Sequence, residues 1–231
     1  MMLQVLGGGA TQSLVTALAP PFQADRKCEI KGNVGAVGAM RDSFLSGHPA
    51  DVLILTAPII AELTRSGHIQ PGSAADIGAV GTGIAVRAGD EQPIIGDAEK
   101  LRAAIAIADE VHFPDPKLAT AGIHFMTVLE RLDLADSIKS RLFTHPNGAT
   151  AMRALAESRS VRPIGCTQIT EILNTRGIML VGAFPKGCEL TTIYTAAVTA
   201  RSPHPELARA FVETLSSAAS VPLRRRLGFE V

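Results

Sequence analysis

The sequence predicts an α/β protein built from two lobes, and three observations carry this prediction. Short apolar runs alternate with helical patterns over the first 70 residues, in the order β-α-β-α-β-α. The same alternation returns later in the chain, and two similar β-rich runs flank that second block. We therefore expect lobe 1 to comprise residues 1–80 and 201–231, lobe 2 residues 88–193, and hinge strands 81–87 and 194–200.

Lobe 1 opens with a strand at residues 3–6 and a helix at 14–22, where Pro20 and Pro21 are expected to end or distort the helix. The remaining elements follow the same alternation. We expect strands at 28–31 and 51–56 and helices at 39–46 and 58–66, with a glycine-rich turn at 32–38. The run at 51–56 is continuously apolar, which is typical of a parallel strand covered on both faces.

Lobe 2 and the tail show the same two kinds of pattern. Expected strands are 106–113, 142–144, 163–167 and 178–184. Expected helices are 97–105, 123–132, 147–159, 168–173, 204–215 and 221–227. Either Asn147 or Thr150 is suited to cap the helix at 147–159.

Composition and charge exclude several classes of function. The chain has 231 residues, of which 46% are hydrophobic and 4% aromatic, so the predicted core is aliphatic. Lys+Arg and Asp+Glu each number 22, and this neutral balance predicts neither a nucleic-acid nor an anionic-membrane partner. There is no run of 18 apolar residues, so no membrane insertion is expected.

No pattern in the chain predicts a metal ion or an organic cofactor. The His, Cys, Asp and Glu residues lack metal-ligand spacing, and there is no phosphate loop that ends in Gly-Lys-Ser/Thr. Three cysteines cannot all pair within the chain. A Cys166–Cys188 disulfide stays open, and free buried thiols are the default expectation.

The first residues run directly into the first strand. They show none of the three parts of an export signal, which are a basic segment, a separate apolar segment and a cleavage site. Two localisations follow as alternatives. We expect a cytoplasmic protein if the chain is complete, and a periplasmic protein if an export signal has been removed.

Residues 7–13, GGGATQS, are the first candidate ligand site. They follow a strand and lead into a helix, whose first N–H groups lack partners within the helix. Glycines allow close approach of a ligand, and the helix dipole adds positive charge there. The segment therefore predicts an anion site without Lys or Arg. An ordinary strand-to-helix turn is the alternative.

Several segments resemble the two-lobed class II solute-binding proteins, specifically the molybdate-binding branch and its divergent relatives. The longest are GATQSL at 9–14, GAVGAM at 35–40 and SGHPADVL at 46–53. Shorter matches are Asp115-Pro116, Ala121-Gly122, Gly165 with Glu171, and Leu227-Gly228-Phe229. The resemblance implies a type II periplasmic-binding-protein-like fold, in which two α/β lobes joined by a two-strand hinge hold a ligand in the cleft between them.

The resemblance also implies ligand positions, taken residue by residue. Serine ligands of the family fall at Gly9-Ala10 and near Val37-Gly38, and its tyrosine ligand falls at Gln168. Backbone donors remain possible at each turn, and Thr11 or Thr120 is placed to supply a hydroxyl. The expected ligand-binding residues are Gly8, Gly9, Ala10, Thr11, Val37, Gly38, Thr120, Ala121, Gly122, Gly148, Ala149 and Gln168.

Two functions follow from the resemblance. The first is a solute-binding protein for a small anion, a molybdate-like oxyanion or a small carboxylate, with an ABC transporter membrane component as a possible partner. The second rests on residues 165–173, GCTQITEIL, which resemble a branch that includes aconitate-isomerase-like proteins. Such an enzyme moves a double bond by proton transfer. A ligand sensor that signals by lobe closure is a third alternative.

His124 and Glu171 are the candidate catalytic residues for that isomerase. Each has a structural alternative: His124 packs on a helix face, and Glu171 lies on the outer face of its helix. Five further residues are expected to be structural or solvated, with contact to a ligand as the alternative for the first two: Arg41, Asp115, Asp51, His112 and His145.

Overall fold

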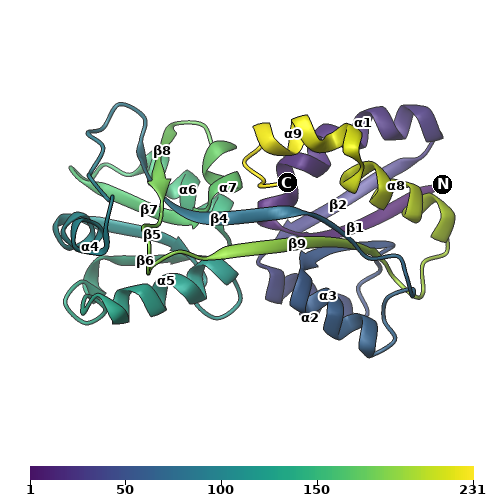
Figure 1. Cartoon of the computed structure of the whole chain (residues 1–231), viewed down its shortest axis with the longest axis horizontal. Helices are drawn as coiled ribbons and strands as arrows, with labels where there is room; N and C mark the ends of the chain where they lie inside the picture. Colours follow the sequence, from purple (N-terminus) through teal and green to yellow (C-terminus); the bar gives the residue numbers. More distant parts are fainter. The chain divides into compact units, whose positions relative to one another are not determined.

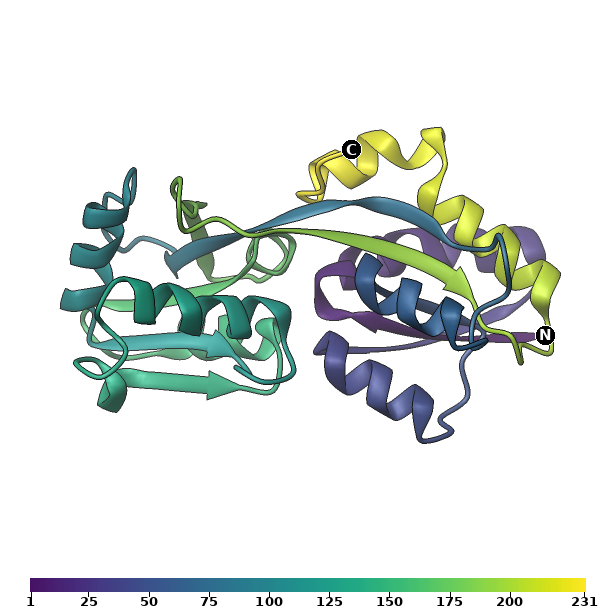
Figure 2. The same ribbon diagram turned by 60° about the horizontal axis from the view of Figure 1, so that its bottom comes forward.

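The computed structural model describes residues 1–231, which divide into two compact units (Figure 1). Unit 1 consists of Met1–Val80 and Thr192–Val231, and unit 2 of Gly81–Thr191. The chain passes from one unit to the other within two neighbouring strands, β4 (Ala75–Arg87) and β9 (Thr191–Val198). These two long strands run side by side in both ribbon views (Figure 2).

Unit 1 is a mostly parallel sheet covered by helices on both faces. Its strands β1 (Met2–Gly8), β2 (Glu29–Gly35) and β3 (Val52–Thr56) are parallel in the order β2-β1-β3, and β9 pairs antiparallel with β3. The apolar runs on β1 and β3 are buried, as coverage on both faces requires, whereas the edge strand β2 is mostly exposed. Its helices are α1 (Gln12–Arg26), α2 (Val37–Leu45), α3 (Ala57–Arg65), α8 (Pro205–Ser216) and α9 (Val221–Arg226), with short 3-10 helices η1 (Gly9–Thr11) and η3 (Ala218–Ser220).

Unit 2 repeats this arrangement. Strands β5 (Glu110–Pro114), β6 (Leu142–His145) and β7 (Pro163–Gln168) are parallel, while β7 and β8 (Ile178–Ala183) each pair antiparallel with β4. Its core includes Phe113 and Phe125, whose rings meet edge to face. Its helices are α4 (Ala98–Ile107), α5 (Thr120–Arg131), α6 (Gly148–Glu157) and α7 (Ile169–Leu173), with a 3-10 turn η2 (Lys139–Arg141).

The first helix was predicted to end at residue 22, with Pro20 and Pro21 ending or distorting it. This end is wrong, because α1 continues to Arg26 with both prolines inside it. Proline cannot donate an intrahelical hydrogen bond, so tertiary contacts hold the last turn. The ring of Phe22 packs edge to face on that of Phe211, with centroids 5.0 Å apart. The side-chain oxygen of Gln23 accepts a hydrogen bond of 2.6 Å from the Ile30 N–H.

The glycine-rich turns are shorter than predicted, because their glycines extend the strands. Gly7 and Gly8 belong to β1, and Gly32 and Gly35 belong to β2. The two strands pair without interruption from Met2↔Glu29 to Gly8↔Gly35, so the ladder holds these glycines extended. The strand expected at 106–113 starts at residue 110 instead, because residues 106 and 107 complete α4.

Three smaller features complete the fold. All three cysteines are free, and Cys166 and Cys188 are buried in the core of unit 2. Burial raises the pKa of the Cys166 thiol well above its usual range. No helix is long and apolar enough to cross a membrane.

Candidate functional site

The carboxyl ends of β1, β2 and β3 lie at one edge of unit 1, because the three strands are parallel and in register. We call this the unit 1 edge. Three helical segments begin there, at Gly9, Val37 and Ala57. No side chain caps them, and their first turns contain no acidic residue. Their first N–H groups therefore form a set of donors at one edge of one unit.

Glycine at position 8 is required by close packing at this edge. A Cβ atom there would lie 2.7 Å from Val37 Cγ1 and 3.0 Å from Tyr194 Cε1. Gly8 therefore lets the start of α2 and the ring of Tyr194 approach the end of β1. Tyr194 is the only tyrosine of the chain and is buried, and the sequence analysis placed it only in a hinge strand.

The structure brings the predicted unit 1 residues together at this edge. Thr11 is fully buried, and its hydroxyl donates to the Gly8 carbonyl at 2.8 Å. That hydroxyl closes the turn, and its role as a ligand group stays a prediction. The other predicted residues lie at the strand end, in the 3-10 turn or in the first turn of α2: Gly8, Gly9, Ala10, Val37 and Gly38.

Unit 2 has a corresponding edge where β5, β6 and β7 end, and we call it the unit 2 edge. Thr120, Ala121 and Gly122 form the first turn of α5, whose N-cap residue has no side-chain hydrogen bond. A Cβ atom on Gly122 would lie 2.2 Å from the Pro114 carbonyl oxygen and 2.4 Å from that of Asp115. Only glycine permits α5 to pack this closely on the end of β5.

The start of α6 is already occupied by an acidic side chain of the same chain. Asn147 caps the helix, since its side-chain oxygen accepts from the Thr150 N–H at 2.9 Å. A Cβ atom on Gly148 would lie 2.0 Å from Glu171 Oε2 and 2.1 Å from Thr167 Oγ1. The Glu171 carboxyl group therefore lies against the helix start that was expected to hold the ligand at Gly148 and Ala149.

Glu171 is buried, which corrects the expectation that it lies on the outer face of its helix. Thr167 Oγ1 donates to its carboxyl at 2.6 Å, and no Lys or Arg pairs with it. Burial raises the pKa of Glu171 to about 7, although the hydrogen bonds from Thr167 and from the backbone of Gln168 and Ala149 act in the opposite direction. A carboxyl group in this state exchanges a proton near neutral pH.

His124 lies in the first turns of α5 but is held by the protein. Its Nε2 lies 2.7 Å from the carbonyl oxygen of Cys188, so this nitrogen carries a proton and donates. The ring also packs against Phe184, with centroids 6.1 Å apart. These contacts link α5 to the segment before β9 and support the packing role for His124. Gln168, the other predicted side-chain ligand, ends β7 and is 3% exposed.

The remaining candidate side chains have partners within the protein. Asp51 accepts hydrogen bonds from the Gln4 N–H and the Ser202 hydroxyl. Asp115 Oδ1 accepts from the N–H groups of Lys117 and Leu118, which is turn chemistry. Arg41 pairs with its neighbour Asp42.

His112, His145 and Glu110 form a polar chain that was not expected from the sequence. Nδ1 of His112 lies 3.1 Å from Nε2 of His145, and Nε2 of His112 lies 3.0 Å from Glu110 Oε2. The hydroxyls of Ser158 and Ser160, and then His112, lower the pKa of Glu110 to about 2, so it is a carboxylate. Glu110 and His112 alternate along β5, and His145 lies on the neighbouring strand β6. This pattern was the sequence signal for the contact between the two histidines. No group of three or more His, Cys, Asp or Glu side chains is placed to hold a metal ion.

The structure has two α/β units, and in each the parallel strands end beside helix starts. This arrangement is typical of the periplasmic binding protein fold, and comparison with known proteins agrees. The chain belongs to the bacterial extracellular solute-binding proteins, whose family it matches over residues 3–230. This match covers almost the whole chain, as the resemblance in the sequence indicated.

Individual relatives are more distant. A curated aconitate isomerase from Pseudomonas sp is 26% identical over 226 residues, which cover 93% of this chain and 82% of that protein. The periplasmic molybdate-binding protein of Azotobacter vinelandii superposes with a TM-score of 0.82 at 18% identity, over 99% of both chains. A sulfate-binding protein from Mycobacterium tuberculosis gives a TM-score of 0.77 at 18% identity, over 99% of this chain and 86% of that one. At these identities the structures establish the fold alone.

Proposed function

We propose that the protein binds a small anion at the helix starts of its two edges, chiefly through backbone N–H groups. The unit 1 edge carries this proposal. Three helical segments begin there without a side-chain cap and without an acidic residue in the first turn. Such helix starts supply both hydrogen-bond donors and a positive field, which together favour an anion.

Among small anions, we propose a carboxylate rather than molybdate. The carboxyl group of Glu171 lies against the start of α6, and its pKa of about 7 leaves it partly ionised at neutral pH. A carboxylate ligand near Glu171 favours the protonated form of Glu171, which can then donate a hydrogen bond to that ligand. The curated relative named aconitate isomerase supports the same ligand class.

A thermal-shift screen tests the ligand class directly. The compounds are molybdate, tungstate, sulfate, phosphate, citrate, and cis- and trans-aconitate. A ligand that binds only the folded state adds about 2.7 kcal/mol of stability at a hundredfold excess over its dissociation constant. We expect a shift with citrate or the aconitates. A shift with molybdate and tungstate alone would contradict the carboxylate proposal while leaving anion binding intact.

Replacing Gly38 by Asp is expected to abolish anion binding. Gly38 is the second residue of α2, so an added carboxylate would repel the ligand at the unit 1 edge. The matched variant Gly38→Ala adds a methyl group without charge and should retain most of the affinity. Ala121→Asp makes the same charge test in the first turn of α5. Isothermal titration with the ligand found by thermal shift measures all three, and unchanged affinity in Gly38→Asp would disprove the site.

A second candidate function, an isomerase of the aconitate type, rests on one specific observation. Glu171 is a buried carboxyl group without a cationic partner at the edge where ligands are proposed to bind, and its pKa lies near neutral. As a carboxylate it can take the proton from an allylic C–H bond. The electron pair of that bond forms a new C=C bond to the central carbon, and the pair of the old double bond moves to the far allylic carbon, where the neighbouring carboxylate stabilises it. The proton returns to that far carbon. Backbone N–H groups at a helix start stabilise the negative charge that develops.

This reaction is observable by NMR. Pure protein is incubated with cis-aconitate, and the trans isomer is followed; in D2O, deuterium should enter the product at the allylic carbon. The variant Glu171→Gln is expected to lose at least a hundredfold in rate. Absence of conversion at high enzyme loading would remove the isomerase and leave the binding protein.

The partner and the compartment follow from the family as proposals. Members are described as extracellular solute-binding proteins, which supports work outside the cytoplasm beside an ABC transporter membrane component. Fractionation of cells that express the full-length gene product tests this. Recovery in the cytoplasmic fraction would favour the isomerase or a sensor instead.

A further inference from the structure

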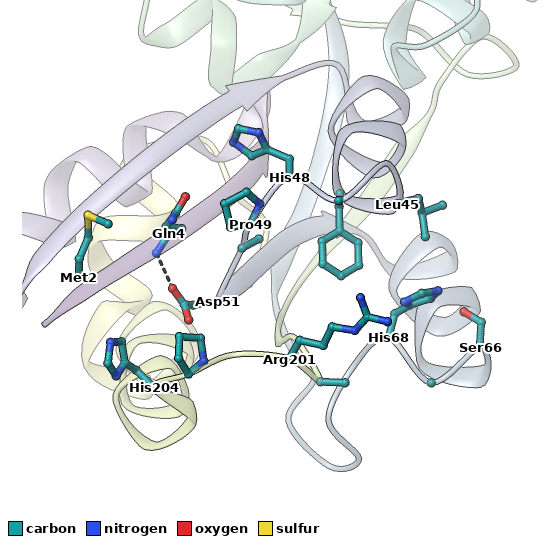
Figure 3. A pocket seen from close by; sticks show the side chains of 16 residues that line it. Met2, Gln4, Leu45, His48, Pro49, Asp51, Ser66, His68, Arg201 and His204 are labelled. Carbon is teal, nitrogen blue, oxygen red and sulfur yellow. Dashed lines mark hydrogen bonds between the residues drawn. The ribbon is translucent and has the colours of Figure 1, made fainter.

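A pocket lies at the opposite edge of the unit 1 sheet from the proposed anion site (Figure 3). Its volume is about 600 Å³, which is within the range of small-molecule sites. It is lined where β1 and β3 begin and beyond the last turns of α2 and α3. Every lining residue belongs to unit 1, so the pocket is complete within one unit.

Four basic or titratable side chains line this pocket without a polar partner: Arg201, His48, His68 and His204. None of their side chains makes a hydrogen bond or an ion pair in the structure. Figure 3 shows the Arg201 guanidinium extending towards the side where His68 and Ser66 lie, whereas His204 lies on the other side. A guanidinium presents five N–H donors in a fixed plane, which suits a carboxylate or a phosphate.

Asp51 is the one carboxylate that lines the pocket, and it is already engaged. It is 4% exposed, and its two oxygens accept hydrogen bonds of 2.7 Å from the Gln4 N–H and 2.5 Å from the Ser202 hydroxyl. These bonds engage both oxygens, and little of the side chain is open to a ligand. The accessible charge in the pocket is therefore positive.

The wall between these groups is apolar. The ring of Phe44 meets that of His68 edge to face, with centroids 5.8 Å apart and planes at 79°. Leu45, Pro49 and Pro203 continue this surface. A flat ring can lie on such a wall while an attached anionic group reaches Arg201.

We propose that this pocket is a second binding site, which takes a small organic anion with an aromatic or apolar body. Arg201 binds the carboxylate or phosphate group, His68 contributes a further donor, and the Phe44 side of the pocket holds the body. The site is independent of the proposed anion site at the unit 1 edge, because β1 separates the two: it begins at the pocket with Met2 and ends at that edge with Gly8.

The test uses the full chain and the variant Gly38→Asp, in which the first site is disabled. Phenyl phosphate is titrated by calorimetry and by histidine NMR signals, with benzoate and inorganic phosphate as comparison ligands. Binding of phenyl phosphate is expected in both proteins, and Arg201→Ala should weaken it at least tenfold. Arg65→Ala is the matched control, because Arg65 is exposed in the last turn of α3 and does not line this pocket. It should leave the affinity unchanged.

The sign of the ligand's charge gives a further test. The titratable and charged groups that line the pocket are Asp51, Arg201 and the three histidines. Stronger binding of benzylamine than of phenyl phosphate, or an unchanged affinity in Arg201→Ala, would overturn the proposal. Binding that disappears in Gly38→Asp would assign the ligand to the first site and overturn it as well.

Discussion

Replacing Glu171 by Gln is expected to flatten the pH dependence of stability between pH 4.5 and 7. In the folded protein burial raises the pKa of this carboxyl from 4.5 to about 7. The folded state therefore keeps a proton that the unfolded chain releases, and the wild type loses about 3 kcal/mol of unfolding free energy as the pH rises through this window. The amide in the Glu171→Gln variant carries no such charge, so at pH 8 the variant is expected to be more stable than the wild type by up to this amount.

Urea unfolding at pH 5 and at pH 8 measures the difference. Glu157→Gln is the control, since Glu157 is exposed at the end of α6, and its pH dependence should match that of the wild type. An equal change in unfolding free energy for wild type and Glu171→Gln would contradict the buried carboxyl.

The same variant separates stability from catalysis. A flattened profile with intact turnover of cis-aconitate would show that Glu171 is not the base.

The second large effect is expected for Gly122→Ala. The new Cβ atom would lie 2.2 Å from one backbone carbonyl oxygen and 2.4 Å from another, those of Pro114 and Asp115. Backbone atoms at the end of β5 can move aside only at a high cost in free energy, so α5 must shift. We expect a loss of about 3 kcal/mol or more, at the upper end of overpacking effects.

Gly96→Ala is the matched control for this prediction. A Cβ atom at Gly96 meets nothing within 4 Å, so the substitution should leave the unfolding free energy nearly unchanged. Urea unfolding compares the two variants with the wild type. A loss below about 1 kcal/mol in Gly122→Ala would mean that α5 does not pack on β5 as closely as described.

The order of elements was predictable from the sequence because each strand is a short apolar run and each helix a longer periodic one. The ends were less predictable. Glycines at positions 32 and 35 indicated a turn, but pairing with β1 along its whole length holds them in β2. The prolines in α1 indicated a helix end, but contacts made by Phe22 and Gln23 extend the helix. Both outcomes depend on partners distant in sequence, which local patterns do not contain.

The candidate site was also predictable from the sequence only in part. The unit 1 edge was predictable, because glycine-rich segments between a strand and a helix mark it directly. The position of Glu171 was not, because a helix of five residues shows too little periodicity to define an inner face. Its burial depends on the start of α6, more than 20 residues earlier in the chain. Tyr194 was missed for the same reason, since only pairing between β9 and β3 brings it to Gly8.

The division of the chain has a consequence for the order of folding during synthesis. Unit 2 is one continuous segment, Gly81–Thr191, whereas unit 1 needs Thr192–Val231 to complete its sheet with β9 and to cover α1 with α8. A ribosome releases the N-terminal end first, yet residues 1–80 must wait for the last part of the chain. We therefore expect unit 2 to be the first protease-resistant part of a nascent chain. Ribosome-bound chains that carry, after residue 191, a linker long enough to span the ribosomal exit tunnel would test this, and early protection of residues 1–80 would contradict it.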